Sequence, residues 1–153
     1  MTVDLAQIAY ESSLRRLDKQ EQSLTEIRSR TGLLLAVASL AASFVGRAAL
    51  AGPLILAVPA LTAFAVTIAA SLYVLAPTPD LQFAVAGSQL YESAYELRDD
   101  IADVHKRLAY QLDGFWQAND RALERVRRSF RVAAWALGME TVLLLASVGG
   151  NLG

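Results

Sequence analysis

The sequence contains no cysteine, and its one histidine is His105. The missing cysteines exclude disulfide bonds, thiolate nucleophiles and cysteine metal sites. One histidine is too few for a histidine-based metal site within one chain. An excess of either charge is also missing, because the formal net charge is −1 at pH 7. We therefore expect no metal, no cofactor and no nucleic-acid partner.

Catalytic signatures are missing as well. The sequence has no glycine-rich phosphate loop, no nucleophile elbow and no paired catalytic carboxylates. The acidic cluster of Asp99, Asp100 and Asp103 lacks the glycine turn and the spacing of a calcium loop. We predict that the protein is not an enzyme.

Long apolar runs dominate what is present. Hydrophobic residues make up 54% of the chain, and the mean hydropathy is +0.35. Gly32–Gly46 is apolar apart from Ser39 and Ser43, and Leu54–Ala76 carries no charge over 23 residues. As a helix, the second run is about 34 Å long, enough to cross a hydrocarbon core of about 30 Å. A third run, Val132–Gly150, carries one charge, Glu140.

These runs predict three transmembrane helices. Small residues in the first run allow close approach of another helix. The first run is short for a span, and extension of its helix from Ile27 or into Arg47–Leu50 gives enough length. Residues 47–53 are expected to form a tight turn, so that 31–77 makes a two-span hairpin. Pro59 should kink the second span near its start. The third span, within 132–153, should continue directly from the helix before it.

The polar segments, 1–30 and 78–131, predict cytoplasmic helices. Residues 1–30 show an apolar seam at helical spacing, which Ser13 and Gln20 interrupt. Residues 81–131 keep a longer stripe, which Asn119 weakens locally. We expect the two stripes to pack on each other as a stalk, within one chain or between neighbours. The first stripe comprises Val3, Ala6, Tyr10, Leu17, Leu24, Ile27 and Thr31. The second comprises Leu90, Ala94, Leu97, Ile101, Val104, Leu108, Leu112, Phe115, Leu123, Val126 and Phe130.

The basic residues predict the orientation. Five of the 14 lie in residues 1–30, eight lie in 80–131, and Arg47 stands alone in the predicted turn. With three crossings, 13 of the 14 fall on one side, which the positive-inside rule places in the cytoplasm. We expect a multi-pass protein of the bacterial inner membrane, with a cytoplasmic N-terminus and an external C-terminus.

Glu140 is the leading candidate for function, because a charge near the bilayer midplane costs about 3 kcal/mol or more. Protonation, a water-filled pore or hydrogen bonds from Ser39, Thr62 or Thr67 would offset that cost. One copy per subunit around a common axis would form a carboxylate ring that favours cations. The alternative is a glutamate that only fixes helix packing. The candidate ion pathway comprises Glu140, Ser39, Ser43 and Thr67.

A second set of residues marks the predicted membrane interfaces. Tyr73 suits the headgroup region, and the cluster from Arg125 to Arg131 can bind anionic lipid headgroups. Arg47 is expected to snorkel outside. The full set is Arg28, Arg30, Arg47, Tyr73, Arg125, Arg127, Arg128 and Arg131.

The run ESSLRRLDKQEQSLTEIRSRTGLLLAVASLAASFVG, a polar helix passing directly into a two-span hairpin, resembles the SLATT class of small bacterial membrane proteins. It also looks like the membrane effectors of cyclic-nucleotide antiphage systems. The similarity covers about residues 10–76. It implies an oligomeric membrane pore or a membrane-disrupting effector.

Taken together, the sequence predicts an all-helical integral membrane protein that forms a homo-oligomeric bundle. The first functional hypothesis is an ion-conducting, cation-selective pore, in the role of a defence effector. The second is a non-conducting scaffold whose cytoplasmic helices recruit a regulator or another protein. The third is a small proton-coupled transporter that uses Glu140.

Overall fold

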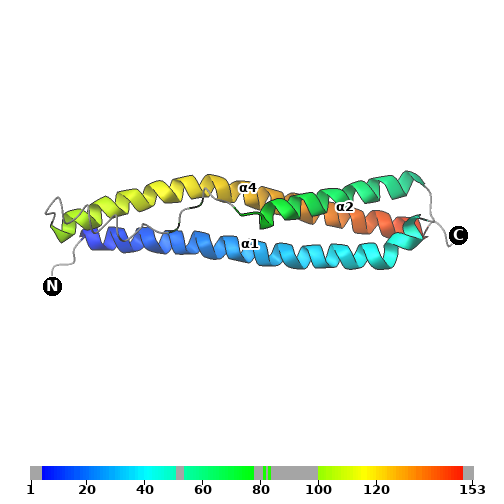
Figure 1. Cartoon of the computed structure of the whole chain (residues 1–153), viewed down its shortest axis with the longest axis horizontal. Coiled ribbons are helices and arrows are strands. Elements are labelled where there is room, and N and C mark those ends of the chain that lie inside the picture. The colour runs from blue at the N-terminus through cyan, green and yellow to red at the C-terminus, as the bar shows by residue number, and fades with distance from the viewer. Residues whose placement is uncertain (1–4, 51–53, 78–80, 82, 84–99, 150–153) are drawn as a thin grey trace. The chain divides into compact units, whose positions relative to one another are not determined.

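The computed structural model describes residues 5–50, 54–77, 81, 83 and 100–149, except for the side chains of 44–50, 54 and 148. Over these residues the chain forms three helices: α1 (Leu5–Leu50), α2 (Leu54–Leu75) and α4 (Ile101–Gly149) (Figure 1). None of the residues in this set belongs to a strand. The predicted all-helical fold class is confirmed.

Helix α1 carries the polar segment into the first apolar run without a break. No proline interrupts its 46 residues. Polar pairs four residues apart support its exposed face: Gln7 donates to Glu11 at 3.0 Å, and Arg15 lies 3.7 Å from Glu11. The predicted turn over residues 47–53 is wrong for its first four residues, which are helical. The strong helix formers Ala48, Ala49 and Leu50 favour that extension, and residues 51–53 lie outside the described part.

Helix α4 begins with an acidic N-terminus that suits the helix dipole. The backbone N–H of Ile101 donates to Asp100 Oδ1 at 2.8 Å, and Asp103 lies in the first turn. The helix then runs for 49 residues to Gly149, so the third apolar run continues the preceding helix, as predicted. The predicted stripe positions Leu90, Ala94 and Leu97, as well as Asp99, lie outside the described residues.

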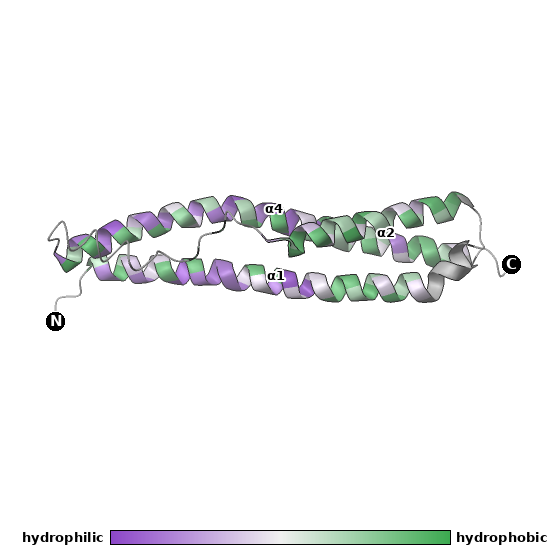
Figure 2. Cartoon of the chain, viewed as in Figure 1, coloured by the Kyte–Doolittle hydropathy of each residue, from purple (hydrophilic) through white to green (hydrophobic). Residues whose placement is uncertain are grey.

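The chain divides into two compact units, and α1 and α4 contribute to both. The first unit contains residues 1–25 and 78–124, and the second contains 26–77 and 125–153. Figure 2 shows that hydrophilic residues dominate the parts of α1 and α4 in the first unit, whereas α2 in the second is largely hydrophobic.

In the first unit, α1 packs against α4 of the same chain. The buried leucines are at most 5% exposed: Leu17 and Leu24 on α1, and Leu108, Leu112 and Leu123 on α4. At these positions α1 of the same chain therefore covers the stripe of α4, and no neighbouring chain is required to bury it. Burial of large apolar side chains is the main source of stability in such a pair.

The polar residues that we expected to weaken this seam are buried in it. Ser13 and Gln20 are at most 7% exposed, and Asn119 is fully buried. Ser13 Oγ donates to Asp113 Oδ1 at 3.3 Å, and Gln20 Nε2 donates to the Trp116 carbonyl at 3.1 Å. Asn119 also has a polar partner. Because buried polar groups are tolerated when they are hydrogen-bonded, the seam continues across these positions.

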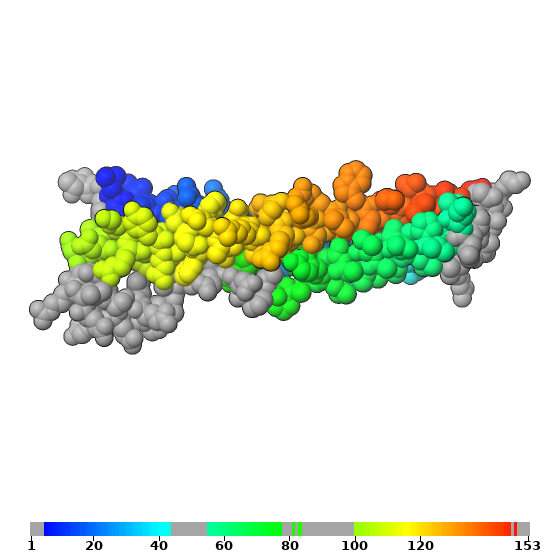
Figure 3. Space-filling view, turned by 90° about the horizontal axis from the view of Figure 1, so that it is seen from above, coloured from blue at the N-terminus to red at the C-terminus, as the bar shows by residue number. Residues whose placement is uncertain are grey.

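In the second unit, α2 lies along the C-terminal part of α4, as Figures 1 and 3 both show. Ala60 packs with Leu143 and Leu144. The buried alanines leave room for close helix approach. At the end of α2, Arg28 of α1 donates to the carbonyls of Val74 and Ala76 at 3.4 and 3.0 Å. The buried alanines are Ala38, Ala57, Ala60, Ala133 and Ala136.

Large apolar side chains of the second unit point outward. Ile55 is 81% exposed, Trp135 is 77% exposed and Leu33 is 68% exposed. Helices α2 and α4 are long and apolar enough to cross a membrane, over Ile55–Leu75 and within Ile101–Ser147. This exposure is consistent with a membrane protein, because lipid-facing side chains are apolar. The end of the first predicted span, 44–46, lies where side chains are not described.

We predict that Leu112→Ala lowers the free energy of unfolding by about 2–5 kcal/mol, because Leu112 is 1% exposed and its truncation leaves a cavity. Leu5→Ala is the matched control, since Leu5 is 80% exposed. Loss of helical circular dichroism on heating the detergent-solubilised protein measures both. Equal melting temperatures would contradict the packing of α1 on α4.

Candidate functional site

Glu140 lies inside the second unit, where α4 contacts the other helices. Its side chain is 1% exposed, and it is the only carboxylate among the buried side chains of the described residues. Its Oε2 atom has no hydrogen-bond partner within the same set. The other buried positions on this face of α4 in the second unit are mostly apolar, such as Ala133, Ala136 and Leu144, and the polar one among them is Ser147. Glu140 is therefore an enclosed carboxyl in an apolar setting.

The hydrogen bonds that we expected to support Glu140 are made elsewhere. Ser39 donates to the carbonyl of Leu35 at 2.9 Å, Thr62 to that of Val58 at 2.9 Å, and Thr67 to that of Ala63 at 3.0 Å. A hydroxyl has one proton to donate. Each of the three gives it to its own helix and none to Glu140.

Two of the four predicted pathway residues share the interior of the second unit. Thr67 is fully buried, and Glu140 is nearly so. Ser39 and Ser43 are exposed on α1, and Ser43 donates to the carbonyl of Ser39 at 2.8 Å. The structure thus groups Glu140 with Thr67 and leaves the two serines on an outer face.

Sequence reasoning missed three more buried hydroxyls as site residues. Thr31 and Ser71 are fully buried, and Ser147 is 1% exposed. Ser71 Oγ has no hydrogen-bond partner among the described residues. The spacing in the sequence could have pointed to two of them. Ser147 follows Glu140 by seven residues and Ser71 follows Thr67 by four, so each pair shares a helix face.

The predicted interface residues fall into distinct settings. Arg28 is half-buried and donates to the C-terminal carbonyls of α2. Arg30 is exposed and pairs with Glu26. Arg127 and Arg131 have polar partners, whereas Arg125 and Arg128 are exposed. Tyr73 is 49% exposed, and the side chain of Arg47 lies outside the described part.

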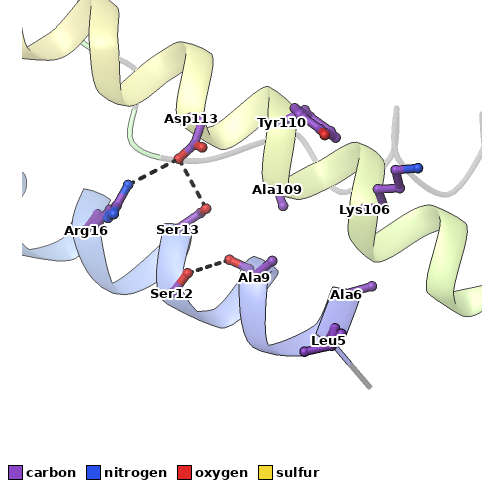
Figure 4. A pocket seen from close by; sticks show the side chains of 10 residues that line it. All are labelled: Leu5, Ala6, Ala9, Ser12, Ser13, Arg16, Lys106, Ala109, Tyr110 and Asp113. Atoms are coloured by element: carbon purple, nitrogen blue, oxygen red, sulfur yellow. Dashed lines mark hydrogen bonds and ion pairs between the residues drawn. The ribbon is translucent and has the colours of Figure 1, made fainter. Parts of the chain in front are cut away.

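An open groove of about 660 Å³ lies between α1 and α4 in the first unit (Figure 4). Arg16 lies 3.7 Å from Asp113 at one end, and its guanidinium carbon is 5.8 Å from the centre of the Trp116 ring. Next to the groove, His105 stacks on Tyr10 with ring centres 5.4 Å apart. The part of the chain that the structure describes holds no cluster of three metal-ligating side chains.

We predict that Glu140→Met leaves the fold intact and raises its thermal stability. Methionine has a similar length and is unbranched, and the substitution removes an unpartnered buried carboxyl oxygen. The gain should approach the cost of about 3 kcal/mol for a charged residue at the centre of a membrane helix. Thermal unfolding in detergent, with Thr67→Val as a control that removes a hydrogen-bonded hydroxyl, measures the effect. A large loss of stability in Glu140→Met would show that the carboxyl holds the helices together.

The comparison with known proteins gives no match. No family model fits the chain, and no characterised sequence or solved structure is significantly similar to it.

Proposed function

We propose that this chain is a homo-oligomeric, ion-conducting membrane protein that favours cations, and that Glu140 lies on the ion pathway. The observation that carries the proposal is the burial of Glu140 with an unpartnered carboxyl oxygen. Ionisable residues within membrane segments are costly and typically mark ion or proton pathways. A glutamate kept only for packing would be expected to have its oxygens satisfied.

The membrane assignment rests on three helical crossings. Helices α2 and α4 are long and apolar enough to supply one each, and we assign the third to α1 from Gly32 onward. Between Arg30 and Arg47 this helix carries no charged residue, and Leu33, Val37 and Leu40 are more than half exposed. The distribution of the 14 basic residues then favours a cytoplasmic first unit and an external C-terminus in the bacterial inner membrane.

Apolar side chains outside the proposed spans support the homo-oligomer. In the first unit, Leu5 is 80% exposed, Ile101 is 70% exposed and Tyr110 is 72% exposed. Leu5 and Tyr110 line the same groove between α1 and α4, and a second copy, which the pore hypothesis requires, is the partner that we assign to it. The resemblance to membrane effectors of antiphage systems suggests that conduction serves bacterial defence.

A second candidate function is a non-conducting scaffold. The groove of the first unit favours it, because Tyr110 and Lys106 present an aromatic ring and a cation to a binding partner beside the Arg16–Asp113 ion pair. Such a scaffold would recruit a cytoplasmic protein without moving ions. Silent liposomes together with capture of a partner by the first unit would support this candidate over the pore.

We predict that a membrane-impermeant maleimide labels the C-terminus but not the first unit in intact cells. The chain has no cysteine, so single variants at Asn151, Ser12 and Asp120 report one position each. In intact cells we expect the maleimide to label only the Asn151→Cys variant. After lysis all three variants should react. Labelling of Asp120→Cys in intact cells would overturn the orientation.

We predict that Glu140→Gln lowers the preference for cations over anions in planar bilayers, because it removes the only carboxylate of the proposed spans. Met139→Gln is the matched control: it places the same amide one residue away at a position that is 61% exposed. Reversal potentials in a salt gradient measure the preference. An unchanged reversal potential in Glu140→Gln would remove Glu140 from the pathway, and a protein silent in every preparation would refute conduction.

A further inference from the structure

The second unit buries an unusual set of polar side chains for a membrane segment. Five of them are at most 1% exposed: Thr31 on α1, Thr67 and Ser71 on α2, and Glu140 and Ser147 on α4. They come from all three helices and are enclosed by a single chain. Two carry an oxygen without a hydrogen-bond partner among the described residues, namely Ser71 Oγ and Glu140 Oε2.

The contacts between the helices order these side chains along the unit. Helix α2 runs opposite to α1 and α4 (Figure 1). Arg28 meets Val74 and Ala76 at one end, and Ala60 packs with Leu144 toward the other. Since helices rise by about 1.5 Å per residue, Thr31 and Ser71 belong to the Arg28 end, Thr67 and Glu140 follow, and Ser147 lies beyond Leu144. The five buried side chains, which we call the row, therefore follow one another in this order along the axis of the unit.

The chemistry of the row suits a proton better than a larger cation. A metal cation that sheds water needs about six oxygen ligands, and selectivity filters provide rings of carbonyls. The row offers one carboxylate and separate hydroxyls, with no cluster of metal ligands in the described residues. A proton needs one acceptor at a time, and hydroxyls both accept and donate hydrogen bonds.

No other side chain of the described spans that is charged at neutral pH competes with Glu140 for the proton; the one other ionisable group there is the phenol of Tyr73. Helix α2 carries no charged residue, and α1 carries none between Arg30 and Arg47. On α4 the preceding charged residue is Arg131, and no other follows Glu140 before Gly149. The groups on the packed helices that flank Glu140 at the Arg28 end are therefore Arg28, Arg30 and Arg131.

We propose that the permeant cation is the proton, and that it crosses through the interior of one protomer along Thr31, Ser71, Thr67, Glu140 and Ser147. Glu140 accepts a proton from hydronium on one side, which leaves water and a neutral carboxyl, and releases that proton to water on the other side. The hydroxyls hold the water that carries the proton to and from Glu140. This inference rests on the proposed function and moves the pathway from a shared axis into the protomer.

The test uses proteoliposomes of the full chain that contain a pH-sensitive dye and are driven by a potassium gradient with valinomycin. We expect proton uptake in the wild type that falls about 100-fold or more in Glu140→Gln, the range that positioned proton-transfer groups contribute. Glu140→Asp, which keeps a carboxyl, should retain part of the flux. Ser71→Ala should slow it several-fold, whereas Ser29→Ala, at an exposed position, should not.

Two further measurements separate this inference from the proposed function. Proton uptake that persists when each vesicle holds at most one chain supports a pathway inside the protomer. Potassium flux without valinomycin as fast as proton flux, or proton uptake that disappears at one chain per vesicle, overturns the inference and leaves an oligomeric pore. No ion flux at any protein density overturns the proposed function itself.

Discussion

The packing of α4 against the other helices is the constraint on which the molecule depends. Buried positions on α4 recur every seven residues, at Leu112, Asn119, Val126, Ala133, Glu140 and Ser147. A seven-residue repeat keeps one helix face against its partners over many turns. The character of that face changes along the helix, from leucines in the first unit to alanines and isolated polar residues in the second.

Buried polar side chains find their hydrogen-bond partners in different places in the two units. In the first unit, Ser13 and Gln20 find partners across the interface, at distances of 3.3 and 3.1 Å. In the second, Thr31 and Thr67 bond to their own helices, and Ser71 and Glu140 keep an unpartnered oxygen. Lipid offers no hydrogen bonds to such atoms. Among the described residues, unpartnered buried atoms also occur in the first unit, at Gln20 Oε1 and His105 Nδ1. What distinguishes the second unit is that one of its unpartnered atoms belongs to a carboxyl inside a long apolar run, which is why we place function there.

Several features were readable from the sequence because they depend on local chemistry alone. The helical class, the direct passage of polar into apolar helix in α1, and the continuity of α4 follow from residue periodicity and from the absence of breakers. Glu140 could be singled out because it is the one charge in a long apolar run. Helix α1 ends three residues beyond the predicted start of the turn at residue 47, because Ala48, Ala49 and Leu50 favour helix.

What the sequence determined by itself is which residues form helices and which segments are apolar enough to meet lipid, since both depend on neighbours along the chain. Only the tertiary structure decided where side chains point relative to other helices. It turned Ser13, Gln20 and Asn119 from expected interruptions into buried members of the seam, and it enclosed Glu140 within a single chain, in the same unit as the buried Ser71 and Ser147. Burial and hydrogen-bond satisfaction depend on helices brought together from distant parts of the chain, and periodicity within one helix does not specify that pairing.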